Sequence, residues 1–291
     1  MSSVFSPSSE RAQVSRLDIG MLDVRDRACL RLLNRVEVAT PSQLAVLIYP
    51  SRRTSFRHLR RLWQLGLVER APILPIRGGI PVAYRLSRRG MTRLGYTDRR
   101  LGGVAHLRHA LDVVASVCAL VRVDPDQVQA WLPESIAGDA GVEPARPDGI
   151  VVLQTTEGSG ALCLEIDEAT EHAPQIRSKL ADYERVLPGR PGWQLLFVVP
   201  TEDRLAWLRR MSRPPANSPL AGRAWGVVLA DLEASGAEAS IAPVGSAGKR
   251  RPLLAILSDP RPRRCPTPVG SDAWIELLGL GGGEELDEVL R

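Results

Sequence analysis

The chain lacks the features on which secreted, zinc-stabilised and membrane-spanning proteins depend. Its four cysteines form no CxxC pair and have no zinc-ligand spacing to its four histidines, which argues against a disulfide framework and a structural zinc site. The longest apolar runs, such as LLFVVP at residues 195–200, are too short to cross a bilayer. The first residues have no basic segment followed by an apolar one, so we expect no secretory signal and a cytoplasmic protein.

Lysine is almost absent, and the positive charge of the chain is carried by arginine. Residues 11–100 hold 19 arginines against 6 acids, a net charge of +13, whereas the whole chain has a net charge of +5 and the remainder is therefore negative. A basic N-terminal third indicates that this part contacts a polyanion. The length of 291 residues and the 44% hydrophobic content favour two globular domains.

The basic third has the pattern of three helices followed by a hairpin. Residues 23–36, 41–49 and 52–65 carry apolar side chains at helical spacing. Two short strands follow, one beginning at Leu67 and one at 82–86, with a Gly-Gly turn between them. This order of elements predicts a winged helix-turn-helix.

The helix expected at 52–65 separates its apolar residues from its basic ones. The predicted apolar stripe consists of Phe56, Leu59, Leu62 and Trp63. The opposite face fits the major groove of DNA, where arginine contacts guanine or phosphate. The candidate DNA-binding residues are Arg52, Arg53, Thr54, Arg57, His58 and Arg61 on this helix, with Arg77 and Arg85 on the hairpin. The alternative is a solvated arginine face in an arginine-rich protein.

The rest of the chain alternates between helical and strand patterns. An apolar helix is expected at 104–121 and a further helix at 174–187, with strands at 128–134, 148–154, 161–167 and 193–200. The strand at 193–200 is apolar throughout, as in the buried centre of a sheet. A helix and a last strand, AWGVVLADL, follow, and from about residue 241 the composition turns to glycine, proline and arginine. The fold class is therefore α/β (α+β), with a loosely structured tail.

Acidic residues in the strand at 161–167 are the most unusual feature of this second part. Glu165 and Asp167 share one face of the strand because side chains alternate, and Asp148 begins the neighbouring strand of the hairpin. Lys179, at the border of the apolar face of the next helix, can reach these acids. Three clustered carboxylates require a positive partner, which is either Mg²⁺ or Mn²⁺, with Asp148 and Glu165 as metal ligands, or a lysine. A structural ion pair between Glu165 and Lys179 or Arg177 is the alternative to a catalytic site.

These acids resemble the PD-(D/E)XK nuclease-like superfamily. Pro147-Asp148 matches its PD, Glu165-Ile166 matches the start of its ExK, Asp167 stands where the family has lysine, and Lys179 with Tyr183 resembles members whose lysine lies on the following helix. The resemblance implies a catalytic set of Asp148, Glu165, Asp167 and Lys179. In that chemistry the acids hold Mg²⁺ and the lysine orients the attacking water.

The order of the winged helix, the RPD strand, the LEID strand and the KLADY helix also resembles the replication-relaxation family of actinobacterial and plasmid proteins. That resemblance spans about residues 20–210 and implies a DNA-binding protein of plasmid or mobile-element replication and transfer. The predicted units are a flexible tail at 1–20, a winged-helix DNA-binding domain at 21–100, a restriction-endonuclease-like α/β domain with a mixed central sheet at 104–235, and a Gly/Pro/Arg-rich and acidic tail at 241–291.

Two functions stay open at this point. One is a protein that binds double-stranded DNA and either cuts it with Mg²⁺, as an endonuclease or nickase, or keeps an inactive nuclease-like domain. The other is a non-catalytic transcriptional or copy-number regulator whose C-terminal domain forms a homodimer or binds a protein partner. A relaxase is disfavoured because His106 and His109, three residues apart, have no third histidine near them in the sequence.

Overall fold

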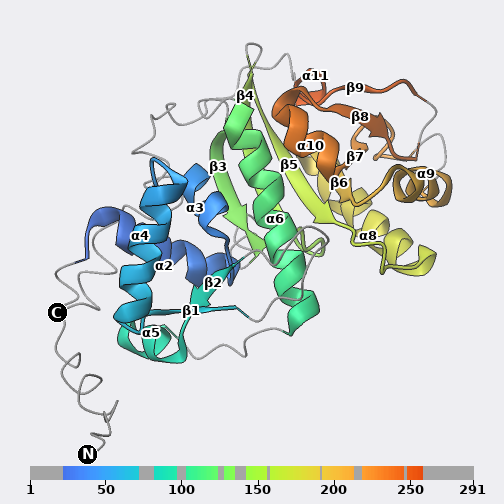
Figure 1. The fold of residues 1–291 in the computed structure, drawn as a ribbon. Helices are drawn as coiled ribbons and strands as arrows, with labels where there is room; N and C mark the ends of the chain where they lie inside the picture. The colour runs from blue at the N-terminus through green and yellow to red at the C-terminus, as the bar shows by residue number, and fades with distance from the viewer. Residues whose placement is uncertain are drawn as a thin grey trace, which may run out of the picture.

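The structure is a computed structural model that describes residues 22–71, 82–96, 103–123, 128–134, 142–155, 158–190, 192–212, 218–245 and 248–257. The predicted tail at 1–20, Arg77 on the predicted wing and the residues from 258 onward lie outside these ranges. A group of helices from the N-terminal third lies on one side of a long helix, α6 (Val104–Val123), and a large sheet lies on its other side (Figure 1).

The N-terminal third has the predicted order of elements. Its helices are α2 (Val24–Val36), α3 (Pro41–Leu47) and α4 (Arg52–Gln64), and its strands are β1 (Val68–Arg70) and β2 (Tyr84–Leu86). The two strands pair antiparallel, with Glu69 opposite Arg85. The local fold is thus three helices followed by a two-stranded hairpin.

Polar side chains begin the short helices α3 and α4. Thr40 and Gln43 form a capping box on α3, in which the Thr40 hydroxyl accepts from the Gln43 amide at 3.2 Å and the Gln43 side chain accepts from the Thr40 amide at 2.8 Å. The Ser51 hydroxyl accepts from the Thr54 amide at 3.1 Å and begins α4. The Ser51 cap fixes where the basic helix α4 starts.

A short helix that was not predicted, α5 (Arg88–Arg93), follows the hairpin. The Ser87 hydroxyl accepts from the Gly90 amide at 2.8 Å and begins it. Gly90 lies directly against the backbone of Leu67, where a Cβ atom would collide with the carbonyl oxygen. Six residues are too few to show a helical period, which is why the sequence pattern did not indicate this helix.

Seven strands form one mixed sheet in the order of the chain. They are β3 (Val128–Pro133), β4 (Gly149–Thr155), β5 (Gly158–Ile166), β6 (Trp193–Val199), β7 (Ala224–Val228), β8 (Ser240–Pro243) and β9 (Arg251–Pro252). The neighbours β5, β6 and β7 run parallel, and the other neighbouring pairs are antiparallel. The predicted α/β fold class with a mixed central sheet is confirmed.

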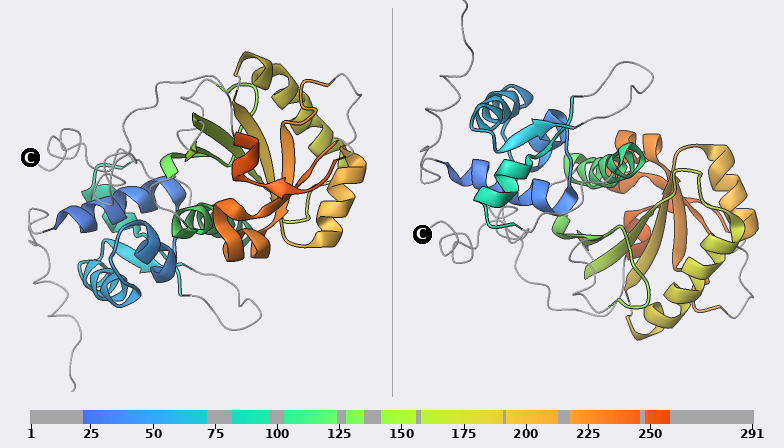
Figure 2. Two further views of the ribbon diagram at one scale, coloured as in Figure 1. Left: turned by 90° about the horizontal axis from the view of Figure 1, so that it is seen from above. Right: turned by 90° about the horizontal axis from the view of Figure 1, so that it is seen from below.

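Helices cover both faces of this sheet (Figure 2). The crossover helices α8 (Ala173–Val186) and α9 (Glu202–Met211) join the parallel strands and pack on one face. Helix α6 and the short α10 (Leu229–Ser235) pack on the other. The remaining described helical elements are short: η4 (Leu187–Gly189), η5 (Gly236–Glu238) and α11 (Leu254–Leu257).

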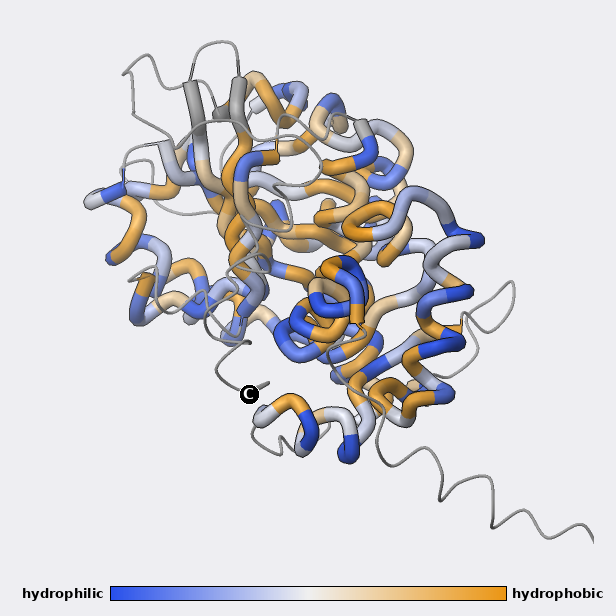
Figure 3. Tube along the Cα trace, turned by 90° about the vertical axis from the view of Figure 1, so that its left-hand side faces the viewer, coloured by the Kyte–Doolittle hydropathy of each residue, from blue (hydrophilic) through white to orange (hydrophobic). Residues whose placement is uncertain are grey.

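Side chains alternate along β5 as the sequence predicts. Leu162, Leu164 and Ile166 belong to the core on the α6 side of the sheet, whereas Cys163 belongs to the core on the α8 and α9 side. Apolar residues run along the central strands, which appear as orange segments in Figure 3, and their side chains belong to the cores on both faces of the sheet. Glu165 shares the face of Cys163, so that its carboxyl group points toward α8.

The sheet extends further along the chain than the sequence predicted. The expected last strand AWGVVLADL divides into β7 and α10, and β8, β9 and α11 follow within the segment assigned to a tail from residue 241. Ile241, Ala242 and Leu253 are buried there. Strands of four and two residues have no clear alternation, and the glycine, proline and arginine around them concealed these buried positions.

Helix α6 connects the two parts of the molecule. The same apolar cluster includes Leu44 of α3, Val114 of α6 and Val151 of β4, so the core is continuous across the predicted domain boundary. Among the described residues, α6 is the one helix long and apolar enough to cross a membrane, yet 56% of that stretch is buried inside the protein. This burial fits the central helix of a soluble protein.

Candidate functional site

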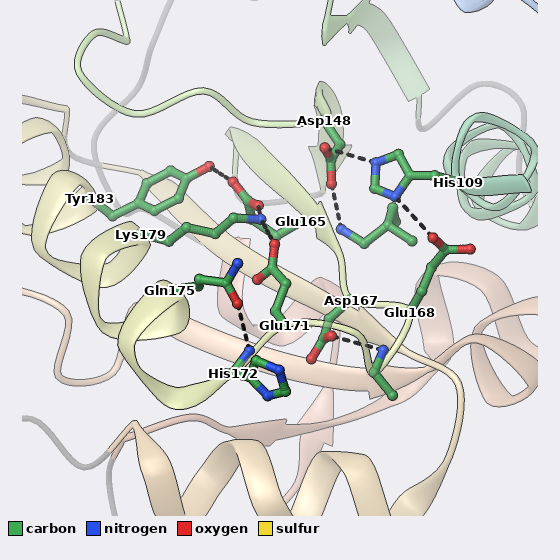
Figure 4. Close-up of polar contacts among 12 residues, drawn as sticks. His109, Asp148, Glu165, Asp167, Glu168, Glu171, His172, Gln175, Lys179 and Tyr183 are labelled. Atoms are coloured by element: carbon green, nitrogen blue, oxygen red, sulfur yellow. Dashed lines mark hydrogen bonds and ion pairs between the residues drawn. The ribbon is translucent and has the colours of Figure 1, made fainter. Parts of the chain in front are cut away.

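Glu165 is the centre of a buried polar cluster on the α8 side of the sheet (Figure 4). It is 1% exposed, and its two carboxylate oxygens accept hydrogen bonds from Lys179 Nζ and from the Tyr183 hydroxyl, both at 2.6 Å. Burial raises the pKa of Glu165 to about 7, and the nearby charge of Asp148 also raises it, while the bonds from Lys179 and Tyr183 lower it. Glu165 therefore changes its charge near neutral pH.

Lys179 reaches Glu165 from α8 because it lies four residues before Tyr183, on the same side of that helix. Its ammonium group also contacts Glu171 Oε1 at 2.8 Å. Burial lowers the pKa of Lys179, but the attraction of Glu165 and the hydrogen bonds to Glu165 and Glu171 outweigh burial, and the net direction is upward. Lys179 therefore stays charged and neutralises the two glutamates.

Asp148 lies at the start of β4 and is held by two partners. Its Oδ2 accepts the backbone N–H of Ile166 at 2.6 Å, and its Oδ1 lies 3.0 Å from His109 Nε2. The hydrogen bond with Asp148 raises the pKa of His109, as do the charges of Asp148 and Glu168, against an opposing effect of burial. The contact with Asp148 thus favours the protonated form of His109, on the side of α6.

Asp167 has a different partner from the other two acids. Arg204 of α9 approaches it with two nitrogen atoms, with Nε 2.7 Å from Oδ2 and Nη2 2.9 Å from Oδ1. The Arg204 guanidinium also lies 3.8 Å from the ring centre of Trp207, which holds it in place. Asp167, at the position where the nuclease superfamily has lysine, is therefore one half of a buried bidentate ion pair.

The three acids do not fit a divalent cation as they are arranged. Asp148, Glu165 and Asp167 each accept from donors on both oxygens, and these donors include His109, Lys179 and Arg204. Within the described stretches, Asp23, Asp26 and His58 are the group whose ligand atoms lie within 4.8 Å of one another, and the strand acids do not meet that distance. Each strand acid instead has its own protein cation.

Three residues of this cluster were missed from the sequence: His109, Glu171 and Arg204. A signal existed for Arg204, since the ends of parallel strands lie at one edge of a sheet and Arg204 follows β6 as Asp167 follows β5. No sequence signal places His109, on a helix 39 residues earlier in the chain, beside Asp148.

A pocket of about 440 Å³ opens beside the Asp148–His109 pair. It is formed where the end of α2, the start of α6 and the start of β4 meet. A second histidine–carboxylate pair, His106 Nε2 and Glu37 Oε2 at 2.8 Å, lies in its wall. The pocket therefore gives solvent access to Asp148, whereas the buried Glu165 does not line it.

The basic helix α4 has a wider exposed face than the sequence predicted. Its buried residues are Ser55, Leu59 and Leu62. Its exposed residues are Arg52, Arg53, Phe56, Arg57, Arg60, Trp63 and Gln64. Phe56 and Trp63, predicted to lie in a buried stripe, are 39% and 54% exposed, because the helix buries only the narrow strip around Leu59. Arg60, absent from the predicted set, lies at the centre of the exposed face.

Two of the predicted DNA-binding residues on α4 have a structural partner. His58 Nδ1 lies 2.8 Å from Asp26 Oδ1, and Arg61 lies 3.1 Å from Asp26 Oδ2. Asp26 is fully buried on α2, so these contacts fasten α4 to α2. Arg61 nevertheless keeps 41% of its side chain exposed.

Two other predicted DNA-binding residues, Thr54 and Arg85, are only partly exposed. Thr54 is half-buried and its hydroxyl lies 3.0 Å from that of Ser51. Arg85 pairs across the hairpin with Glu69 at 2.6 Å and is 15% exposed. The strongest group of available cations is therefore the four exposed arginines of α4.

Comparison with known proteins gives one match. The model of the replication-relaxation family matches residues 30–194, a segment that begins in α2 and ends in β6. It contains α4 and the cluster of Asp148, Glu165 and Lys179, and ends before Arg204. Neither a curated protein nor a solved structure matches the chain significantly.

Proposed function

Because the chain belongs to the replication-relaxation family, we propose that it is a double-stranded-DNA-binding protein that acts in the replication or transfer of a plasmid or mobile element. The observation that carries this proposal is the exposed face of α4. Four arginines project from it, and the helix itself contains no acidic residue. The location we propose for such a protein is the cytoplasm.

Helix α4 suits the major groove in both charge and shape. An α-helix fits that groove, where arginine binds guanine with two hydrogen bonds or contacts phosphate. Within the described part of the chain, Arg53, Arg57 and Arg60 have no carboxylate partner that would neutralise them. With α2 and α3 behind it and the β1–β2 hairpin beside it, α4 occupies the place of the recognition helix in a winged helix.

The first prediction concerns the salt dependence of DNA binding. If four arginines of α4 meet phosphates, the logarithm of the binding constant should fall with the logarithm of salt concentration with a slope of about −4. Arg57→Ala should weaken binding and make the slope shallower by about 1. Fluorescence anisotropy of a labelled duplex at several salt concentrations measures both.

A matched control for this experiment is Arg185→Ala on α8. Arg185 is 67% exposed and lies across the sheet from α4. It should leave affinity and slope unchanged. Equal losses in the two variants would show that binding reflects overall charge and not the face of α4.

A second candidate function is Mg²⁺-dependent cleavage or nicking of DNA. It is favoured by one observation, that Asp148, Glu165 and Lys179 lie together as the nuclease resemblance implies. The ion pairs described above favour a structural role instead. We propose that the acids stabilise the fold and that the α/β domain serves dimerisation or partner binding.

The second prediction separates these functions. Supercoiled plasmid incubated with the protein and Mg²⁺, Mn²⁺ or EDTA should be shifted on a gel in all three and nicked in none. Glu165→Gln, which keeps the size of the side chain, should bind equally well. Metal-dependent nicking that disappears in Glu165→Gln and in Lys179→Ala would establish a nuclease and overturn the structural role.

A further inference from the structure

The exposed face of α4 contains two large aromatic rings among its arginines. Phe56 is 39% exposed and Trp63 is 54% exposed. They are seven residues apart, two helical turns, and therefore project from the same side of α4. Water-exposed rings at these positions add nothing to the core, since the buried side of α4 is formed by Leu59 and Leu62.

The surroundings of Phe56 determine what can cover it. The Arg52 guanidinium lies 5.5 Å from the centre of the Phe56 ring, and Arg53, Arg57 and Arg60 are exposed around it. An apolar protein surface would have to bury these charges without compensation. The occupant must therefore be a polyanion that also offers apolar groups to the helix.

Duplex DNA has one such group in its major groove, the C5-methyl group of thymine. Guanine presents acceptors for arginine in the same groove, so a helix with both kinds of side chain can read both bases. We propose that Phe56, assisted by Trp63, packs on thymine methyl groups and gives α4 a preference for thymine-containing sites. This inference rests on the proposed function of α4 in DNA binding. Phe56 is the primary contact because it lies in the N-terminal half of the helix, from which recognition helices contact base edges.

The test compares thymine with deoxyuridine, which lacks only the methyl group. Duplexes enriched by the full-length protein from a random-sequence pool are copied once with dTTP and once with dUTP. The uracil form should bind about fourfold more weakly for each methyl group covered. Phe56→Ala should lose most of the preference for the thymine form, whereas Arg57→Ala should weaken both forms and keep their ratio. Circular dichroism verifies that each variant is folded. We expect both to fold because Phe56 and Arg57 are exposed.

The outcomes are distinct for the two proposals. Equal binding of both duplex forms by the wild-type protein would overturn the thymine contact and leave DNA binding intact. A preference for thymine that persists in both Phe56→Ala and Trp63→Ala would also overturn the assignment to these rings. Failure to bind or enrich any duplex would overturn the proposed function itself.

Discussion

Replacing Lys179 with methionine is expected to lower the free energy of unfolding by about 3–5 kcal/mol at pH 8. The physical reason is the burial of Glu165, which is 1% exposed and has Lys179 as its cation at 2.6 Å. Without Lys179 the carboxylate remains enclosed with the Tyr183 hydroxyl and near the charge of Asp148. Urea unfolding followed by tryptophan fluorescence measures the loss.

Two further variants make this result specific. Lys179→Met combined with Glu165→Gln should recover most of the stability, because position 165 then carries no buried charge and only the partly exposed Glu171 loses its cation. Arg185→Ala, which breaks an exposed ion pair with Asp182 on the same helix, should cost less than about 1 kcal/mol. A loss below that level in Lys179→Met would show that the Glu165–Lys179 pair does not stabilise the fold. Folded Lys179→Met should still bind DNA, since α4 does not depend on this pair.

The contrast between the cluster around Glu165 and helix α4 shows what the sequence can predict. The period-two pattern of β5 placed Leu162, Leu164 and Ile166 in one core and turned Glu165 to the other face, and the period of α8 brought Lys179 to the same place. Both conclusions rest on local geometry that neighbouring residues dictate. Such predictions succeed because each strand or helix has only one way to bury its apolar side.

The errors arose where tertiary packing decides. The helical period of α4 gave the direction of its buried side but not its width, so Phe56 and Trp63 were predicted to be buried although they are 39% and 54% exposed. Asp26 on α2 engages His58, a contact between residues 32 apart in the chain. Likewise the partner of Asp167 is Arg204, on the helix that follows a different strand. Periodicity carries no information about which element lies opposite a side chain.

The buried acid also predicts how stability depends on pH. Burial raises the pKa of Glu165 in the folded protein to about 7 from an ordinary value of 4.5. The folded state therefore binds this proton more tightly than the unfolded state, so its stabilising effect is complete below pH 4.5 and is lost as pH rises to about 7. Each pH unit within that window should lower the free energy of unfolding by about 1.4 kcal/mol.

Glu165→Gln isolates this effect because its side chain does not titrate. The stability of the wild-type protein minus that of Glu165→Gln should fall between pH 4.5 and 7 and be constant above it, as measured by urea unfolding at each pH. Burial also raises the pKa of Asp112 to about 6, but Asp112 is present in both proteins and cancels in the difference. Glu238→Gln, the same substitution at an exposed glutamate, controls for the loss of a carboxyl group at the surface. A difference that instead rises with pH would mean that Lys179 and Tyr183 outweigh burial and keep Glu165 ionised in the folded protein.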